Sequence, residues 1–398
     1  MKRFRYPFYG ALAAFAVLGA AELAACGGIL FTNLFSFSQT NGYDPRPRIV
    51  LGANGIIYGT TAGGGRYDRG TAFSLKPDGS LTTLLVFDGT NGGSLYGGII
   101  GATDGNFYGT AYDGGSNGMG TVFRLTADGD FTTLVAFAGT NGARPSASLM
   151  QGADGALYGT TPSGGAYSNG SAFRLTTNGV LTTLISFAGT DGRDPESNLF
   201  QGRDGAFYGT TRLGGAYGYG TVYRLTSDGR LQTLISFDGT NGYWPVGGVI
   251  EGLDGNFYGT TVGFLAGNRG SVFKLTTNGA LTTLVEFNGT NDASPLSELV
   301  RCRDGSLLGT ATFGGINPYG AGTIFRITRD DAFETIYQFD GNDGSHPRST
   351  LVESPDGTFY GVTSEGGSRY AGNVFRVSIP LQPLIDSMTF STGALKLS

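Results

Sequence analysis

The sequence repeats a short motif about every 50 residues, and this period limits the fold more than any other feature. The motif reads Asp-Gly-x-Phe/Leu-Tyr-Gly-Thr, and a glycine-rich loop and a string such as Gly-Thr-Val-Phe-Arg-Leu-Thr follow it. With variations, its aromatic position is occupied in turn by Tyr58, Tyr108, Tyr158, Tyr208, Tyr258, Leu308 and Tyr360. A fixed period of this length indicates a repeat architecture in which each copy is one supersecondary unit.

Each copy contains four strand-like runs separated by turn residues. In the second copy these runs cover residues 97–102, 106–110, 121–126 and 131–137. Asp-Gly and Asn-Gly pairs stand between alternating runs, which is a strong hairpin signal because both residues tolerate positive φ. The runs are rich in Leu, Val, Phe, Tyr and Thr, as β-strands prefer. Outside the N-terminus no stretch has a helical apolar period, so we expect four antiparallel strands per copy.

The two ends of the repeated region distinguish a closed ring from a linear solenoid. Residues 31–45 match only the last run of a copy, and residues 351–377 supply only the first three. Together they make one complete unit, so the N-terminal strand would complete the last blade and remove the open edges. A solenoid would instead carry polar caps at both ends. We therefore predict an all-β, seven-bladed β-propeller over residues 29–379.

Composition excludes two classes of protein. Glycine is abundant, with 71 residues, but aromatic residues reach 12% and hydrophobic residues 39%. This is too much apolar, strand-forming material for a disordered low-complexity chain. The net charge of −5 argues against a nucleic-acid partner, because binding the phosphate backbone needs a basic surface.

Residues 1–25 have the pattern of an export signal. A basic start precedes an apolar stretch, residues 11–21, that is too short for an ordinary transmembrane helix. Leu23-Ala-Ala-Cys26 resembles a bacterial lipobox, in which the cysteine is lipidated, although Glu22 departs from that pattern. Ordinary secretion with cleavage near Ala21 or Ala25 is the alternative. On either reading we expect an exported protein. We favour the lipoprotein, which would be held at the cell envelope with Cys26 as the lipidation site and only membrane contact.

Two further features lie outside this pattern. Residues 380–398 lose the repeat and are too short for a domain, so they form a docked tail or the start of a further module. Cys302 stands where the other copies have Gly, Ala or Ser, so we interpret it as a small packing residue rather than a nucleophile.

The full repeat resembles a known family. The string from Asp-Gly-x-Phe/Leu-Tyr-Gly-Thr, through Gly-Gly and Phe-Arg-Leu-Thr, to Leu-Thr-Thr-Leu and Gly-Thr-Asn-Gly is similar to the Gloeo/Verruco (GloVer) tandem repeat over residues 31–378. Such repeats occur in exported, often surface-anchored bacterial proteins. The resemblance implies export and a propeller-like array, and it brings no reaction or catalytic residues.

The best candidates for ligand contact are residues that vary between copies. The slot before the loop proline is the least uniform and reads Asp44, Ser94, Arg144, Asp194, Trp244, Ser294 and His346. We expect this slot to rim the channel mouth, where Tyr43, Tyr96, Arg193 and Tyr243 would add stacking and hydrogen-bonding groups. Aromatic residues with arginine suit a sugar ring or a peptide. The alternative is that the slot residues are solvated loop tips without a role.

Catalytic and metal chemistry find little support. One histidine cannot supply a zinc site, and no Gly-x-Ser-x-Gly elbow precedes a helix. Carboxylate pairs for glycoside hydrolysis could come from Asp194 with Glu196, or Asp44 with Asp68, but nothing in the sequence marks either pair as buried. Calcium could bind near Asp88 or in residues 340–343, although Asx turns are the better explanation of those strings. We predict no catalytic residue, no metal site and no cofactor.

The sequence therefore favours an exported, envelope-anchored propeller that binds an unknown glycan or protein. Two alternatives stay open: a polysaccharide-active hydrolase or lyase that uses carboxylates or tyrosines of the loop face, and a purely structural cell-surface repeat protein.

Overall fold

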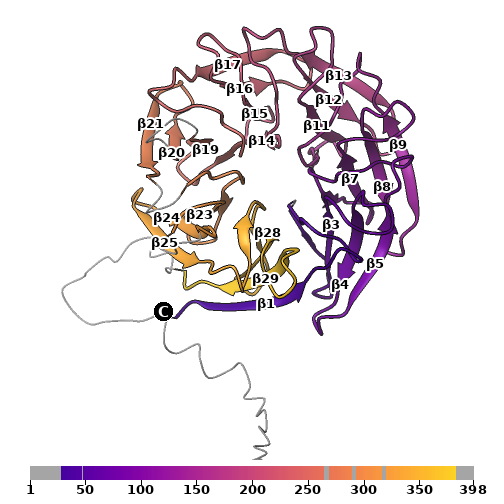
Figure 1. The fold of residues 1–398 in the computed structure, drawn as a ribbon. Helices are drawn as coiled ribbons and strands as arrows, with labels where there is room; N and C mark the ends of the chain where they lie inside the picture. Colours follow the sequence, from indigo (N-terminus) through magenta and orange to yellow (C-terminus); the bar gives the residue numbers. More distant parts are fainter. Residues whose placement is uncertain (1–27, 47, 264–268, 289–292, 316–319, 382–398) are drawn as a thin grey trace, which may run out of the picture.

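The computed structural model describes residues 28–46, 48–263, 269–288, 293–315 and 320–381. The described residues form seven antiparallel sheets arranged in a ring, and they contain no helix (Figure 1). The predicted seven-bladed propeller is confirmed. The expected signal segment, Cys26 and nearly all of the tail lie outside the described residues. Within those ranges, no helix is long and apolar enough to cross a membrane.

Each of the first six blades contains four strands that pair in chain order, from the innermost to the outermost. Their bounds are as follows: β2 (Val50–Leu51), β3 (Ile57–Thr61), β4 (Thr71–Leu75) and β5 (Leu81–Val86) in blade 1; β6 (Ile99–Gly101), β7 (Phe107–Ala111), β8 (Thr121–Leu125) and β9 (Phe131–Ala136) in blade 2; β10 (Met150–Gln151), β11 (Leu157–Thr161), β12 (Ser171–Leu175) and β13 (Leu181–Ser186) in blade 3; β14 (Phe200–Gln201), β15 (Phe207–Thr211), β16 (Thr221–Leu225) and β17 (Leu231–Ser236) in blade 4; β18 (Val249–Glu251), β19 (Phe257–Val262), β20 (Gly270–Leu275) and β21 (Leu281–Glu286) in blade 5; and β22 (Val300–Arg301), β23 (Leu307–Ala311), β24 (Thr323–Ile327) and β25 (Phe333–Gln338) in blade 6.

Blade 7 joins the two ends of the chain, as predicted. It contains β26 (Ser345–Pro347), β27 (Val352–Glu353), β28 (Thr358–Glu365) and β29 (Asn373–Ser378), and β1 (Leu30–Ser36) pairs with β29 as its outermost strand. Figure 1 shows β1 running along the outside of this blade. The ring therefore has no free strand at the junction of its ends, which removes the edge that an open array would expose.

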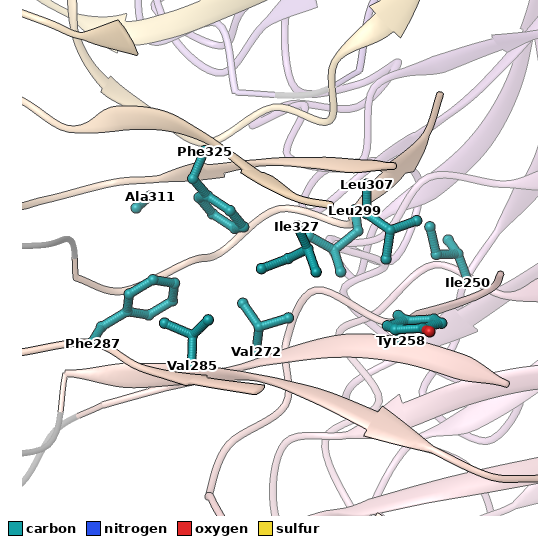
Figure 2. Close-up of a cluster of buried hydrophobic side chains, with 10 residues drawn as sticks. All are labelled: Ile250, Tyr258, Val272, Val285, Phe287, Leu299, Leu307, Ala311, Phe325 and Ile327. Atoms are coloured by element: carbon teal, nitrogen blue, oxygen red, sulfur yellow. The ribbon is translucent and has the colours of Figure 1, made fainter. Parts of the chain in front are cut away.

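The core lies between neighbouring blades. Figure 2 shows one such layer, in which Tyr258 and Val272 of blade 5 face Phe325 and Ile327 of blade 6. A buried phenylalanine just after each outer strand contacts the ring of an aromatic residue in the third strand of the next blade. All seven junctions have this pair, with ring centroids 5.1–5.6 Å apart: Phe37–Phe73, Phe87–Phe123, Phe137–Phe173, Phe187–Tyr223, Phe237–Phe273, Phe287–Phe325 and Phe339–Phe375.

The same aromatic ring explains the glycine of the Tyr-Gly-Thr motif. A Cβ atom added at Gly159 would lie 2.7 Å from the Phe173 ring, on the neighbouring strand of the same blade. Real Cβ atoms do not approach so closely, and the ring cannot move away because it is fully buried. The glycine therefore lets the ring lie flat across the middle of the blade.

The repeated aspartate and tyrosine of the motif have a structural role. In blade 3 the Tyr158 hydroxyl donates to Asp154 Oδ2 over 3.0 Å, and Arg174 Nη2 donates to the same oxygen over 2.8 Å. Blade 4 repeats this arrangement with corresponding residues. These groups lie at the tight Asp-Gly turns, so they fasten the first three strands of a blade together.

Closure of the ring can be tested at β1. Phe31 stacks on Tyr337 with centroids 4.4 Å apart and also contacts Phe375, whereas its neighbour Leu30 is 49% exposed. We expect Phe31→Ala to lower the free energy of unfolding by roughly 2–4 kcal/mol, because it empties a packed site between blades. Leu30→Ala should change it by less than about 0.5 kcal/mol. Urea unfolding followed by circular dichroism measures both, and equal losses would contradict the closure.

Candidate functional site

The loops after the second and fourth strands of each blade open on one side of the ring, which we call the loop face. The variable slot lies in the loop that leads from one blade to the next. All seven slot residues have left-handed backbone angles, with φ between 52° and 58°. This conformation costs a non-glycine residue about 1–2 kcal/mol, and yet no slot holds glycine.

Hydrogen bonds of the main chain hold the slot in this conformation. Each slot N–H donates to a carbonyl in the preceding blade over 2.7–3.2 Å, as Trp244 does to Tyr219. In five blades the slot carbonyl also accepts an N–H of the following blade over 3.0–3.3 Å, as from Val262 to Trp244. The slot peptide thus bridges two blades through its backbone. Its side chain is not needed for that bridge, which explains why it varies.

Two slot residues carry carboxylates with arginines nearby. Arg46 Nε donates to Asp44 at 2.6 Å, so this aspartate is paired. Burial raises the pKa of Asp194, against the nearby positive charges of Arg193 and Arg212. Burial likewise raises the pKa of Glu196, whose Oε1 lies 3.4 Å from Arg212 Nη1. The second proposed pair does not form a free acid/base site, because Asp68 instead accepts the N–H of Gly64 within its own loop.

The aromatic slot residues are partly buried, whereas the Arg144 side chain is exposed. The guanidinium of Arg212 lies 5.1 Å from the Trp244 ring centroid. His346 packs edge-on against Phe313, with ring centroids 4.9 Å apart, and its Nδ1 lies 3.2 Å from Glu365 Oε2. Arg144 lies over Tyr112 at 5.8 Å. The aromatic slot residues therefore expose only part of their rings to a ligand, because the remainder already contacts neighbouring side chains.

The supporting residues proposed around the slot differ in accessibility. Arg193 is exposed, and Tyr96 is partly buried with Arg46 5.1 Å from its ring centroid. Tyr43 is partly buried, and a hydrogen bond to Asp68 raises its pKa. Tyr243 differs from the expectation that it adds a stacking group, because only 3% of it is exposed. It packs between Trp244 and Tyr219 instead.

A second set of aromatic residues is far more exposed, and sequence analysis missed it. We call Tyr67, Tyr167, Tyr217 and Tyr370 the tyrosine rim; their exposed fractions are 50%, 62%, 63% and 83%. All four lie on loops between the second and third strands, and therefore on the loop face. Their common position after Gly-Gly, with Tyr370 shifted by one, was the signal that could have identified them.

A small cavity lies on the axis of the ring, just after the slot loops, and we call it the channel mouth. Its volume is about 100 Å³, and residues from all seven blades line it. Larger cavities of about 350 and 620 Å³ continue from it along the inner strands. Most of the lining positions stand two or four residues after the slot: Arg46, Arg48, Tyr96, Ser146, Ser148, Asn198, Val246, Leu296, Glu298, Arg348 and Thr350.

Glu298 is the acidic group of the channel mouth. Its carboxylate accepts Asn198 Nδ2 at 3.4 Å, and Asn198 Oδ1 in turn accepts the N–H of Ser148 over 2.8 Å. Burial raises the pKa of Glu298 to about 7, despite the opposing charge of Arg48 and the bond from Asn198. Near neutral pH this carboxyl is thus divided between its two protonation states.

Little in the described residues points to a metal site. No group of three or more His, Cys, Asp and Glu side chains lies close enough together there to hold an ion. Asp88 Oδ1 accepts the N–H groups of Thr90 and Asn91, so this candidate calcium ligand forms an Asx turn. Cys302 is buried, and burial raises its pKa to about 12, which agrees with a packing role.

Comparison with known proteins identifies the repeat. The sequence profile of the Gloeobacter/Verrucomicrobia repeat matches residues 22–203 and 195–375, which together cover most of the chain. No curated protein matches the chain at a significant level.

Similar solved structures share the fold. Virginiamycin B lyase from Staphylococcus aureus superposes with a TM-score of 0.59 and 16% identity, over 88% of this chain and 99% of that one. The extracellular domain of a protein described as a hybrid two-component system, from B. thetaiotaomicron, gives a TM-score of 0.58 and 12% identity, over 86% of this chain and 39% of that one. At such low identity the likeness establishes the fold alone.

The left-handed slot makes a prediction about stability. At Arg144 we expect glycine to be tolerated, because it adopts this φ without steric cost, and valine to be unfavourable, because it is β-branched. Arg144→Gly should therefore exceed Arg144→Val in free energy of unfolding by roughly 2 kcal/mol. Chemical denaturation of the two variants measures this difference. Equal stabilities would show that the backbone at this slot is not constrained.

Proposed function

The chain belongs to the Gloeobacter/Verrucomicrobia repeat family, and from that premise we propose that it is an exported binding module whose loop face holds the ligand. The tyrosine rim is the observation that carries this proposal. Large apolar side chains that are exposed and gathered on one face are typical of interaction sites. Val180 and Leu253, by contrast, are single exposed residues at turns of the opposite face.

The chemistry of the rim supports a glycan or a peptide as ligand. A tyrosine ring gives a flat apolar surface with a hydrogen-bonding end, which suits the face of a sugar or an extended peptide. The left-handed slot supports the same face. Its backbone would be least strained with glycine, so the side chains there are retained at a cost of stability.

A second candidate is a polysaccharide-active enzyme, either a hydrolase or a lyase. Glu298 favours it, because a carboxyl with a pKa of about 7 can act as a general acid or base at neutral pH. Product analysis after incubation with acidic and neutral polysaccharides tests this candidate. Turnover that Glu298→Gln abolishes would establish an enzyme.

We expect the rim to determine ligand binding. A variant with Tyr67→Ser, Tyr167→Ser and Tyr217→Ser should lose at least about tenfold in affinity for whichever probe of an oligosaccharide and peptide panel binds the wild type, because several stacking contacts are removed together. Calorimetry measures the affinity, and emission of the single Trp244 gives a second readout.

The matched control carries Val180→Ser and Leu253→Ser, which remove exposed apolar groups from the opposite face. It should bind as the wild type does. Binding that survives in the rim variant would refute the assignment of the loop face. A wild type that binds no member of the panel would favour the purely structural alternative.

The envelope anchor rests on Cys26 and has its own test. In a bacterial host supplied with labelled palmitate, we expect incorporation into the wild-type protein and none into Cys26→Ser, because the lipid is attached through this thiol. Cell fractionation should then move the variant from the membrane to the soluble fraction, since lost acyl chains remove most of the membrane affinity. An unlabelled wild type would leave ordinary secretion as the route of export.

A further inference from the structure

The channel mouth concentrates positive charge in a protein that is acidic overall. Three arginines, Arg46, Arg48 and Arg348, line one small cavity and come from the adjacent blades 7 and 1. The net charge of the whole chain is −5, so a cluster of three arginines is opposite in sign to the protein as a whole. Like charges held close together repel, so an anion beside them is stabilising, and Asp44 and Glu298 supply part of that compensation.

Two of these arginines have no carboxylate partner. Arg46 is neutralised by Asp44 at 2.6 Å. Among the described residues, neither Arg48 nor Arg348 has a carboxylate oxygen within 4.0 Å. Burial, and then the charge of Arg46, lower the pKa of Arg348, against the opposing charges of Asp44 and Glu365.

Two residues that line the cavity also carry hydrogen-bonding atoms that are buried and unpaired. Arg348 Nε and Ser146 Oγ are both shielded from solvent and have no hydrogen-bond partner among the described residues. Both residues line the channel mouth. A buried donor without a partner costs free energy, so two of them in one cavity point to an acceptor that binds there.

The size of the cavity limits the group that fits. About 100 Å³ accommodates a few water molecules or one small polar group, but not a sugar ring with its substituents. A guanidinium group matches a planar carboxylate or a tetrahedral oxyanion through parallel N–H bonds. Tyr96 lines the same cavity and contacts Tyr112, which begins the next loop of the loop face, so the mouth is continuous with that face.

We infer that the channel mouth binds an anionic group, a carboxylate or a sulfate, of the ligand that the loop face holds. This inference rests on the proposed binding function and specifies the ligand class: an acidic rather than a neutral molecule. Arg48 and Arg348 provide the charge, Ser146 adds a hydrogen bond, and the tyrosine rim holds the remainder of the ligand.

Glu298 makes the site sensitive to pH. The groups that face it are Arg48 and Asn198, and Arg46, Arg348 and Tyr96 line the same cavity. Below neutral pH the carboxyl is protonated and does not repel an anion, whereas above neutral pH it becomes a competing negative charge. Arginine does not titrate in this range. Anion affinity should therefore fall as the pH rises from 6 to 8.

The test is calorimetric titration of the purified protein with sodium sulfate and, separately, with sodium glucuronate, in a buffer of low chloride content. The stronger of the two probes identifies the preferred anion. We expect Arg348→Gln and Arg48→Gln each to weaken its binding at least about tenfold, since each removes charge-assisted hydrogen bonds. Arg230→Gln removes an arginine that is 85% exposed at a turn of the opposite face, and should leave the affinity unchanged.

The pH dependence of anion affinity gives a second readout. A purely structural role of the channel mouth would not produce it. Wild-type affinity should fall several-fold between pH 6 and pH 8, and Glu298→Gln should remove this dependence while retaining binding. Circular dichroism verifies that each variant is folded. Unchanged anion binding in both folded arginine variants, or no binding of either anion to the wild type, would overturn the inference.

The rim variant separates this inference from the proposed function. If the loop face binds the ligand and the mouth binds its anionic group, the rim variant should lose the oligosaccharide or peptide probe and keep the small anion. If the rim variant loses the oligosaccharide or peptide probe but the wild type binds neither sulfate nor glucuronate, the proposed binding module stands and the acidic ligand is refuted. Anion binding in a protein that binds no larger probe would refute the binding module instead.

Discussion

The contact on which the ring depends is the aromatic pair between consecutive blades. A single four-stranded sheet has two apolar faces and cannot bury either of them alone. Phe287 and Phe325 illustrate the solution: the first follows the outer strand of blade 5, the second lies in the middle of blade 6, and both are buried. Because the pair recurs at all seven junctions, each blade buries apolar surface against both neighbours, and closure through β1 supplies the last junction.

A second constraint acts on the backbone of the slot and leaves its side chains variable. The slot peptide donates to one blade and accepts from the next, so its left-handed geometry is imposed by the ring rather than by the residue. Side chains at the slot are therefore free of structural duty. Two and four residues further on, alternate residues of the inner segment face the channel. Variation around the ring is thereby concentrated near the axis, where a ligand can meet all seven blades.

The sequence was sufficient for the fold because its signals are local and repeated. Asp-Gly turns, alternating runs and the split last copy determine strands, blade number and closure, and the structure confirms each of them. The site was harder to predict, because its accessibility depends on packing. Tyr243 and Tyr217 are both loop tyrosines, but 3% of the first and 63% of the second are exposed. Arg48 and Glu298 stand about 250 residues apart, and only the closed ring makes them line one cavity. An alignment of the seven copies would have identified both residues at the positions two and four residues after the slot, since inner-strand positions alternate between core and channel.

The polarity of the channel mouth is the last feature that follows from this architecture. A ring of identical copies would place the same side chain around the axis seven times, and seven like charges could not be held together in about 100 Å³. Here the copies differ: arginines come from blades 7 and 1, Glu298 comes from blade 6, and Ser148 and Asn198 lie opposite. The pseudo-symmetry of the fold is thus broken at the axis while it is kept at the blade junctions. Some polar groups of the mouth link neighbouring blades, as Ser148 and Asn198 do, but Arg348 Nε and Ser146 Oγ are left unpaired at a cost in free energy. An asymmetric, incompletely satisfied cavity within a regular ring is what recognition of one oriented, charged group requires.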